Sequence, residues 1–112
     1  ALIAQMVNTF NTQLRNAVAG EPKILYADAY TANIDQINNP ALHGLSDVKL
    51  RACDLSAAKN PLMSSLGCNA GNLVTGTDVG HFLFADGVHP TPFGHLLLAR
   101  FVSKEMIIKG WL

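Results

Sequence analysis

The sequence predicts an α/β fold in which short buried strands alternate with amphipathic helices. Three observations lead to this prediction: a helix-spaced apolar pattern over residues 2–18, a second one from Pro92 to about Lys109, and two short apolar runs at 23–27 and 81–85. Strands that are apolar on both faces are typical of parallel sheets covered by helices. We therefore expect parallel strands with helices packed against them.

Length and composition limit the chain to one small domain with no strong charge. The 112 residues include eight Lys plus Arg and eight Asp plus Glu, so the formal net charge is zero, and 49% of residues are hydrophobic. This balance argues against disorder and against the basic surface that nucleic-acid binding needs. No apolar run is long enough to span a bilayer. With only 14% charged residues, we expect some apolar surface to be covered by something outside this sequence.

The first third of the sequence predicts a helix, a strand and a second short helix. Gly20 and Pro22 suit the end of the first helix. The run at 23–27 then predicts a strand, and residues 31–38 predict a helix that stops before Pro40. The apolar residues of the first helix recur at three- and four-residue steps: Ile3, Met6, Val7, Phe10, Leu14, Ala17 and Val18.

The stretch from Pro40 to Gly80 predicts a long irregular segment, rich in Asn, Asp, Gly, Ser and Pro. Cys53 and Cys68 lie within it. An even number of cysteines in such a stretch favours a disulfide and an oxidising compartment, and two separate buried thiols are the alternative. A loop closed by that bond would gain about 3 kcal/mol in the chain-entropy model.

The C-terminal third predicts a strand, a loop and a long helix. Residues 81–85 form the predicted strand, and residues 86–90 the loop. Thr91 suits the N-cap of the helix with Pro92 at its first position, and Gly110 suits its end.

The loop carries the residues that indicate chemistry. Asp86 and His89 lie three residues apart, just after a buried strand, where ligands bind in open α/β sheets. A carboxylate beside an imidazole fixes the ring tautomer and stabilises its charged form, so the other ring nitrogen can accept a proton from a nucleophile. The alternative is an Asp that caps a turn beside an unrelated His.

The surroundings of this pair resemble a known family. The run from Asp86 to Thr91 (Asp-Gly-Val-His-Pro-Thr), followed by Gly94-His95, resembles the last conserved block of the SGNH hydrolases. The segments 24–30, 39–40 and 43–45, together with Asn11 and Cys53, are similar to the preceding part of the GDSL lipase and esterase branch. The resemblance implies that residues 1–112 form the C-terminal portion of a single three-layer α/β/α domain. It also implies that Asp86 is the acid, and His89 the base, of a Ser-His-Asp triad.

The nucleophile of that family is missing from the sequence. Neither the Gly-Asp-Ser block nor the Gly-x-Asn-Asp block occurs. The serines present are not in a nucleophile-elbow context: Ser46, Ser56, Ser64, Ser65 and Ser103. Ser64-Ser65 is interpreted as a turn. We therefore expect the serine and the oxyanion hole to come from an N-terminal half of the same enzyme, and we expect this chain alone to be inactive.

The resemblance implies a carboxylic ester hydrolase of the lipase, esterase or phospholipase type, secreted or periplasmic, acting on a lipid or another acyl ester through an acyl-serine intermediate. It implies no cofactor. The alternatives are an acyltransferase that uses the same site and a non-catalytic structural or interaction module. A metal site is not predicted, because the spacing of Asp86, His89 and His95 fits no standard ligand pattern.

The roles of several other residues allow two interpretations. Met63 and Leu66 are candidates for contacting the substrate, and a simply packed loop is the alternative. Asp28 is predicted to cap the helix that follows it rather than to line the site. His95 is predicted to pack or to form a hydrogen bond, and His43 and His81 to be structural or solvated.

Overall fold

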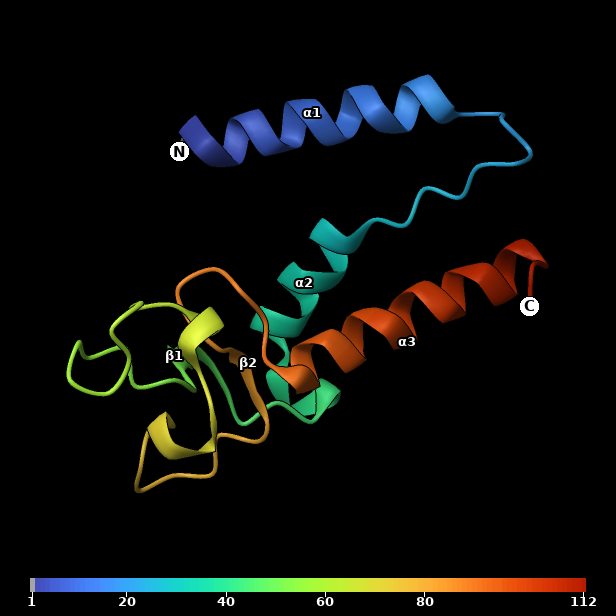
Figure 1. Cartoon of the computed structure of the whole chain (residues 1–112). Helices are drawn as coiled ribbons and strands as arrows, with labels where there is room; N and C mark the ends of the chain where they lie inside the picture. The colour runs from blue at the N-terminus through green and yellow to red at the C-terminus, as the bar shows by residue number, and fades with distance from the viewer. Residues whose placement is uncertain (1) are drawn as a thin grey trace.

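The structure, a computed structural model, describes residues 2–112 and is built from helices and a small parallel sheet (Figure 1). The main elements, in chain order, are α1 (Leu2–Val18), α2 (Ala29–Asn38), β1 (Asp47–Arg51), β2 (Phe82–Phe84) and α3 (Pro92–Lys109). Single turns of 3₁₀ helix occur at Pro40–His43, Ser65–Gly67 and Ala70–Asn72.

The sheet pairs β1 with β2 in parallel, with Asp47 opposite Phe82 and Arg51 opposite Phe84. The pairing extends past both strands, because the N–H of Cys53 donates to the carbonyl of Ala85 at 3.0 Å. Mixed α/β structure with a parallel sheet is therefore confirmed. Within residues 2–112 the sheet has two strands, so the third layer stays a prediction.

The core lies where α3 and α2 meet the sheet. Leu45, Leu83 and Leu97 are buried together. Ile37, Val48, Phe84 and Phe93 pack against them. The first turn of α3 lies so close to β2 that a Cβ on Gly94 would come within 2.8 Å of the Leu83 carbonyl oxygen. Gly94 therefore allows the close contact between the helix and the strand.

The three predicted helices are present, and two of them begin at residues predicted to cap them. The Thr91 side chain accepts the N–H of Gly94 at 3.0 Å, and Gly110 ends α3 in the left-handed conformation. Asp28 caps α2, since its carboxylate accepts the N–H of Thr31 at 3.0 Å. The capping reading of Asp28 is confirmed, and α2 begins before the predicted residue 31.

The prediction of a strand at residues 23–27 is wrong, because Ile24–Asp28 have no regular structure. A strand requires a neighbour for its backbone hydrogen bonds, and within residues 2–112 none lies beside this segment. Conversely, Asp47–Arg51 is a strand within the stretch predicted to be irregular. Here β2 supplies the partner.

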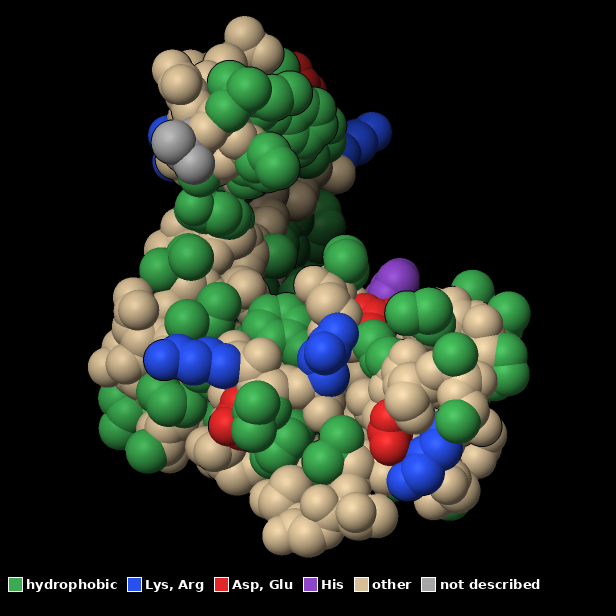
Figure 2. All heavy atoms as spheres, turned by 90° about the vertical axis from the view of Figure 1, so that its left-hand side faces the viewer, with side chains coloured by type: hydrophobic (Ala, Val, Ile, Leu, Met, Phe, Trp, Pro, Cys, Tyr) green, Lys and Arg blue, Asp and Glu red, His purple; other side chains and the backbone are tan. Residues whose placement is uncertain are grey.

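The apolar face of α1 is exposed. No residue of α1 is buried, and hydrophobic side chains gather on this projecting helix (Figure 2). Its large exposed hydrophobic residues are Leu2, Ile3, Met6, Phe10 and Leu14. The radius of gyration is 16.6 Å, whereas a compact domain of this length has about 13 Å. The expected uncovered apolar surface is therefore present.

Candidate active site

The loop at residues 85–90 is held in shape by its own backbone and by the elements at its two ends. The Ala85 N–H donates to the His89 carbonyl at 2.9 Å. At the loop's exit, the Thr91 N–H donates to the Leu83 carbonyl at 3.0 Å, and the buried Thr91 hydroxyl donates to the Phe82 carbonyl. The loop therefore leaves β2 and returns beside it before α3 begins.

The Asp86 carboxylate lies inside this loop with 7% of its side chain exposed. Its Oδ1 accepts the N–H of Val88 at 2.8 Å and the N–H of His89 at 2.7 Å. Its Oδ2 accepts the N–H of Ser65 at 2.7 Å. Two of these donors are local, while Ser65 comes from a distant part of the chain.

These donors keep Asp86 ionised. The N–H of His89, followed by those of Val88 and Ser65, holds the pKa of the Asp86 carboxyl far below the ordinary value, against the opposing effect of burial. A carboxylate that accepts several N–H groups is stabilised in its charged form and is also fixed in orientation.

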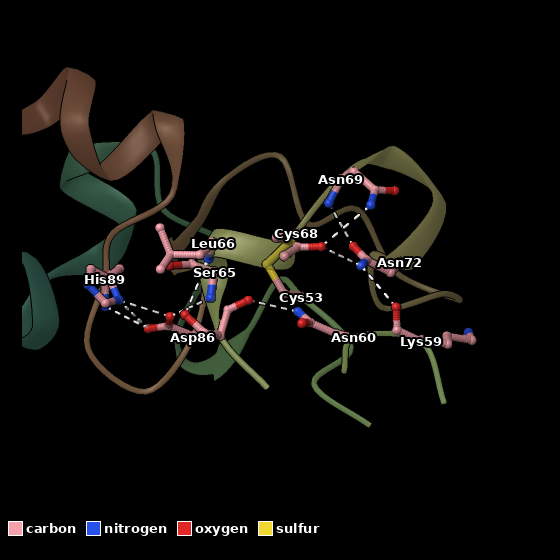
Figure 3. The surroundings of a disulfide bond; sticks show 12 residues. Cys53, Lys59, Asn60, Ser65, Leu66, Cys68, Asn69, Asn72, Asp86 and His89 are labelled. Carbon is pink, nitrogen blue, oxygen red and sulfur yellow. Dashed lines mark hydrogen bonds and ion pairs between the residues drawn. A yellow bond between two sulfur atoms is a disulfide. The ribbon is translucent and has the colours of Figure 1, made fainter. Parts of the chain in front are cut away.

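His89 faces this carboxylate. Its Nδ1 lies 2.9 Å from Oδ2 and 3.1 Å from Oδ1 of Asp86 (Figure 3). Because Nδ1 faces an ionised acceptor, it carries the ring proton in the neutral imidazole, and Nε2 is left as the proton acceptor. Nε2 makes no hydrogen bond within residues 2–112, and 60% of the side chain is exposed. The arrangement can therefore take a proton from an incoming hydroxyl.

A disulfide joins Cys53 and Cys68, with their Cα atoms 5.9 Å apart (Figure 3). Cys53 follows β1, and its N–H donates a hydrogen bond to the carbonyl of Ala85, the residue before Asp86. Cys68 follows the turn that presents the Ser65 N–H. The predicted disulfide is present, and it ties the Ser65 turn to the strand ends beside the site.

Met63 and Leu66 lie in different surroundings. Leu66 is 86% exposed and follows Ser65, so it is attached to the residue that contacts Asp86. Met63 lines a separate groove with Leu50 and Val74. The structure therefore brings Leu66, but not Met63, to the Asp86–His89 pair.

None of the five serines hydrogen-bonds to His89 within residues 2–112. Ser64 caps the turn at Ser65–Gly67 through its side chain, which confirms the turn reading. Ser65 meets Asp86 through its backbone N–H at 2.7 Å, and its side chain also contributes to lowering the pKa of Asp86. Sequence reasoning missed this contact, and no side-chain pattern could have signalled it because every residue except proline carries a backbone N–H.

The other histidines lie outside the pair. His43 pairs with Asp35 at 2.8 Å, and His81 packs edge-on against Phe93. His95 is exposed, and its side chain makes no hydrogen bond among the described residues, so neither of its two predicted roles is seen here. In the described part of the chain, no three His, Cys, Asp or Glu side chains are grouped to hold a metal. No helix described here has both the length and the apolar character needed to cross a membrane.

Comparison with known proteins gives the same family repeatedly. A GDSL esterase/lipase of Arabidopsis thaliana is 28% identical over 111 residues, which cover 99% of this chain and 28% of the relative. A second from the same plant is 31% identical over 75% of this chain and 22% of its own length. A third is 30% identical over 79% of this chain.

This chain belongs to the GDSL esterase/lipase family. The match lies in the C-terminal part of those proteins. The chain spans about a quarter of the length of the GDSL relatives it matches. No protein-family model matches it, and no solved structure matches it significantly.

Proposed function

We propose that this GDSL relative provides the acid and the base of a serine ester hydrolase, with Asp86 and His89 in these roles. The observation that carries the proposal is the hydrogen bond between an ionised, buried carboxylate and Nδ1 of a ring whose Nε2 is accessible. The relationship to GDSL esterases/lipases supports the hydrolase class.

In the proposed reaction, Nε2 of His89 takes the proton of a serine hydroxyl as the oxygen attacks the ester carbonyl carbon. The carbonyl π bond opens to an oxyanion, and Asp86 stabilises the imidazolium. As the oxyanion collapses, the bond to the alcohol breaks and Nε2 returns its proton to the leaving oxygen. Water then repeats the sequence on the acyl-serine and releases the acid.

The serine and the oxyanion hole are proposed to come from a segment outside residues 1–112, together forming a single three-layer domain of which this chain is the C-terminal portion. The exposed apolar face of α1 supports this proposal, because it offers surface for such a segment to cover. The open two-stranded sheet also supports it, since further strands can pair at its edges.

The substrate is proposed to be an acyl ester, with the acyl part meeting apolar side chains beside His89. Leu66 and Val88 are both strongly exposed, and each is next in sequence to a residue that binds Asp86. Met63 is proposed as a more distant contact. The disulfide supports a secreted or periplasmic enzyme, because such bonds persist in oxidising compartments.

The test uses a polypeptide in which residues 1–112 are preceded by the GDSL-type segment that carries the serine. A fluorophosphonate probe should label this polypeptide, and His89→Ala should abolish labelling and lower ester hydrolysis by more than about 10⁴-fold. His95→Ala is the matched control and should retain both.

Equal labelling in the His89→Ala variant, or no labelling of any extended form, would contradict the proposal. The second result would favour a non-catalytic module. Product analysis with an added alcohol acceptor separates hydrolysis from acyl transfer, because only the latter forms a new ester.

A further inference from the structure

The loop between the two cysteines, residues 54–67 and called here the disulfide loop, contains one fully buried polar side chain. Asn60 has 0% of its surface exposed, although most of the loop around it is exposed. Its side-chain nitrogen Nδ2 donates to the Ser64 carbonyl at 2.7 Å. Its backbone N–H donates to Ser56 and its carbonyl accepts the N–H of Met63, both at 2.8 Å. Asn60 therefore organises the loop from inside.

The amide of Asn60 has one polar atom that makes no hydrogen bond among the described residues. Its Oδ1 is buried and has no hydrogen-bond partner within residues 2–112. A buried acceptor without a partner is unfavourable, because it loses the hydrogen bonds that water would give it in the unfolded chain. Turning the amide over would not remove this cost, because Oδ1 would then face the Ser64 carbonyl oxygen. The loop therefore needs the donor Nδ2 at this position, and the unpaired oxygen accompanies it.

The Ser64 carbonyl and the Ser65 N–H belong to the same peptide group. A peptide group is planar, so fixing the direction of its carbonyl also fixes the direction of its N–H. Asn60 Nδ2 binds the carbonyl end at 2.7 Å, and Asp86 Oδ2 accepts from the N–H end at 2.7 Å (Figure 3). Asn60 and Asp86 therefore hold opposite ends of one rigid unit.

We propose that Asn60 is a positioning residue for the Asp86–His89 pair: by holding the Ser64 carbonyl, it aims the Ser65 N–H at Oδ2 of Asp86. The role rests on the function proposed above. Oδ2 is the oxygen nearer to Nδ1 of His89, at 2.9 Å. Its other donor is Ser65, whereas Oδ1 is held by the loop's own N–H groups. If the Ser65 N–H moves away, the carboxylate loses its only distant restraint among the described residues.

Gly67 gives a second way to disturb Asn60. A Cβ at Gly67 would lie 2.5 Å from Oδ1 of Asn60, and this buried side chain has no space to move into without shifting Nδ2. Gly67 is not in the left-handed conformation, so alanine there changes packing and not backbone strain. Gly67→Ala should therefore act like Asn60→Ala without leaving a cavity.

The first measurement uses the wild-type chain. Amide hydrogen exchange followed by NMR should show protection of the Ser65 N–H and slow exchange of the Asn60 side-chain NH₂. Free exchange of either group in the folded chain would overturn the proposal, and this result does not depend on any variant folding.

The second measurement follows the ¹³C signal of the Asp86 carboxyl during a pH titration. In the folded Asn60→Ala and Gly67→Ala variants, the midpoint should rise compared with wild type because one donor to the charged form is lost. Asn39→Ala, which removes an exposed amide bonded to Asp35, and Gly71→Ala, which meets only the exposed Asn69 side chain, are matched controls and should leave the midpoint unchanged.

If the Asp86 midpoint is unchanged in folded Asn60→Ala or in folded Gly67→Ala, the positioning role of Asn60 is overturned. The readout needs no esterase activity, so its failure is distinct from failure of the proposed function. In an active extended polypeptide, both variants should lower kcat by up to about 10²-fold with little change in KM, as expected for misplacement of a catalytic group.

Discussion

At the scale of single residues, the site depends on the backbone N–H groups that donate hydrogen bonds to the Asp86 carboxylate. Three N–H groups replace the water that the carboxylate would bind in an unfolded chain. This arrangement favours the ionised form in the folded state, so the charge of Asp86 contributes to stability as well as to the proposed chemistry.

The contribution of Asp86 should therefore depend on pH. Its folded-state pKa is lowered, so the stabilisation is complete above the unfolded pKa of about 3.9 and is lost as pH falls towards the folded pKa. The difference in unfolding free energy between wild type and Asp86→Asn should be constant from about pH 6 to 8 and should shrink below about pH 4. Urea denaturation across this range measures it.

Glu21→Gln is the control for this titration, because the Glu21 side chain is exposed and makes no hydrogen bond among the described residues. Its unfolding free energy relative to wild type should show no comparable low-pH change. A wild-type advantage over Asp86→Asn that grows on acidification would contradict the lowered pKa of Asp86.

The residue types and spacing were enough to predict which two side chains would meet. Asp86 and His89 are close in sequence and lie between a strand and a capped helix, so local rules determine their encounter. Ser65 and Asn60 could not be predicted in the same way. Their roles depend on a tertiary contact of a backbone N–H with a carboxylate 21 residues away.

At the scale of elements, α3 is positioned on β2 by close contact. Gly94→Ala tests this contact, since the new Cβ would lie 2.8 Å from both the Leu83 carbonyl oxygen and the Pro90 Cβ. Helix propensity alone would favour alanine by about 1 kcal/mol. We expect the opposite, a loss of about 1–3 kcal/mol from overpacking, measured by urea denaturation.

Gly87→Ala is the control for this substitution, because its Cβ would meet no atom within 4 Å and its backbone is not left-handed. It should change the unfolding free energy by less than Gly94→Ala does. If Gly94→Ala raises the unfolding free energy, α3 and β2 are not in the close contact described above.

The disulfide is the second element that fixes the site. Its cysteines are 15 residues apart, a separation for which the chain-entropy model gives about 3 kcal/mol. The double variant Cys53→Ser/Cys68→Ser should lose about this much unfolding free energy. Dithiothreitol should reduce the stability of wild type to a similar extent and leave the double variant unchanged, and a double variant as stable as wild type would contradict the prediction.

The accuracy of the element predictions follows from where hydrogen bonds are made. Helices satisfy their own backbone groups, so the apolar spacing and the caps Thr91 and Gly110 predicted their ends. Strands need partners. The alternation of apolar Val48 and Leu50 with charged neighbours is a strand signal, but it is only five residues long and lies among turn-forming residues.

At the scale of the whole molecule, the chain is extended because α1 does not join the core. Helices in proteins are stabilised mainly by packing of their apolar face. The sequence predicted this helix and its face correctly. It could not specify what lies against the face, because amphipathic spacing indicates which side is apolar and carries no information about the partner.

The exposed face of α1 should cause self-association of the isolated chain. Phe10→Lys replaces the one aromatic residue of α1, which is exposed, and should shift the sedimentation distribution towards monomer, with little change in unfolding free energy because no residue of α1 is buried. Gln13→Lys adds the same charge at another exposed position and should have a smaller effect. Equal sedimentation distributions for Phe10→Lys and wild type would show that this face does not mediate self-association.

The strand, turn and first helical turn that hold Asp86 and His89 form one uninterrupted run, residues 82–94, and among residues 2–112 Ser65 alone reaches the pair from elsewhere. A circular permutant opened between α1 and α2 would therefore keep the acid and base in register. A permutant opened inside the disulfide loop would keep the two side chains together but would free the Ser65 turn that contacts Asp86.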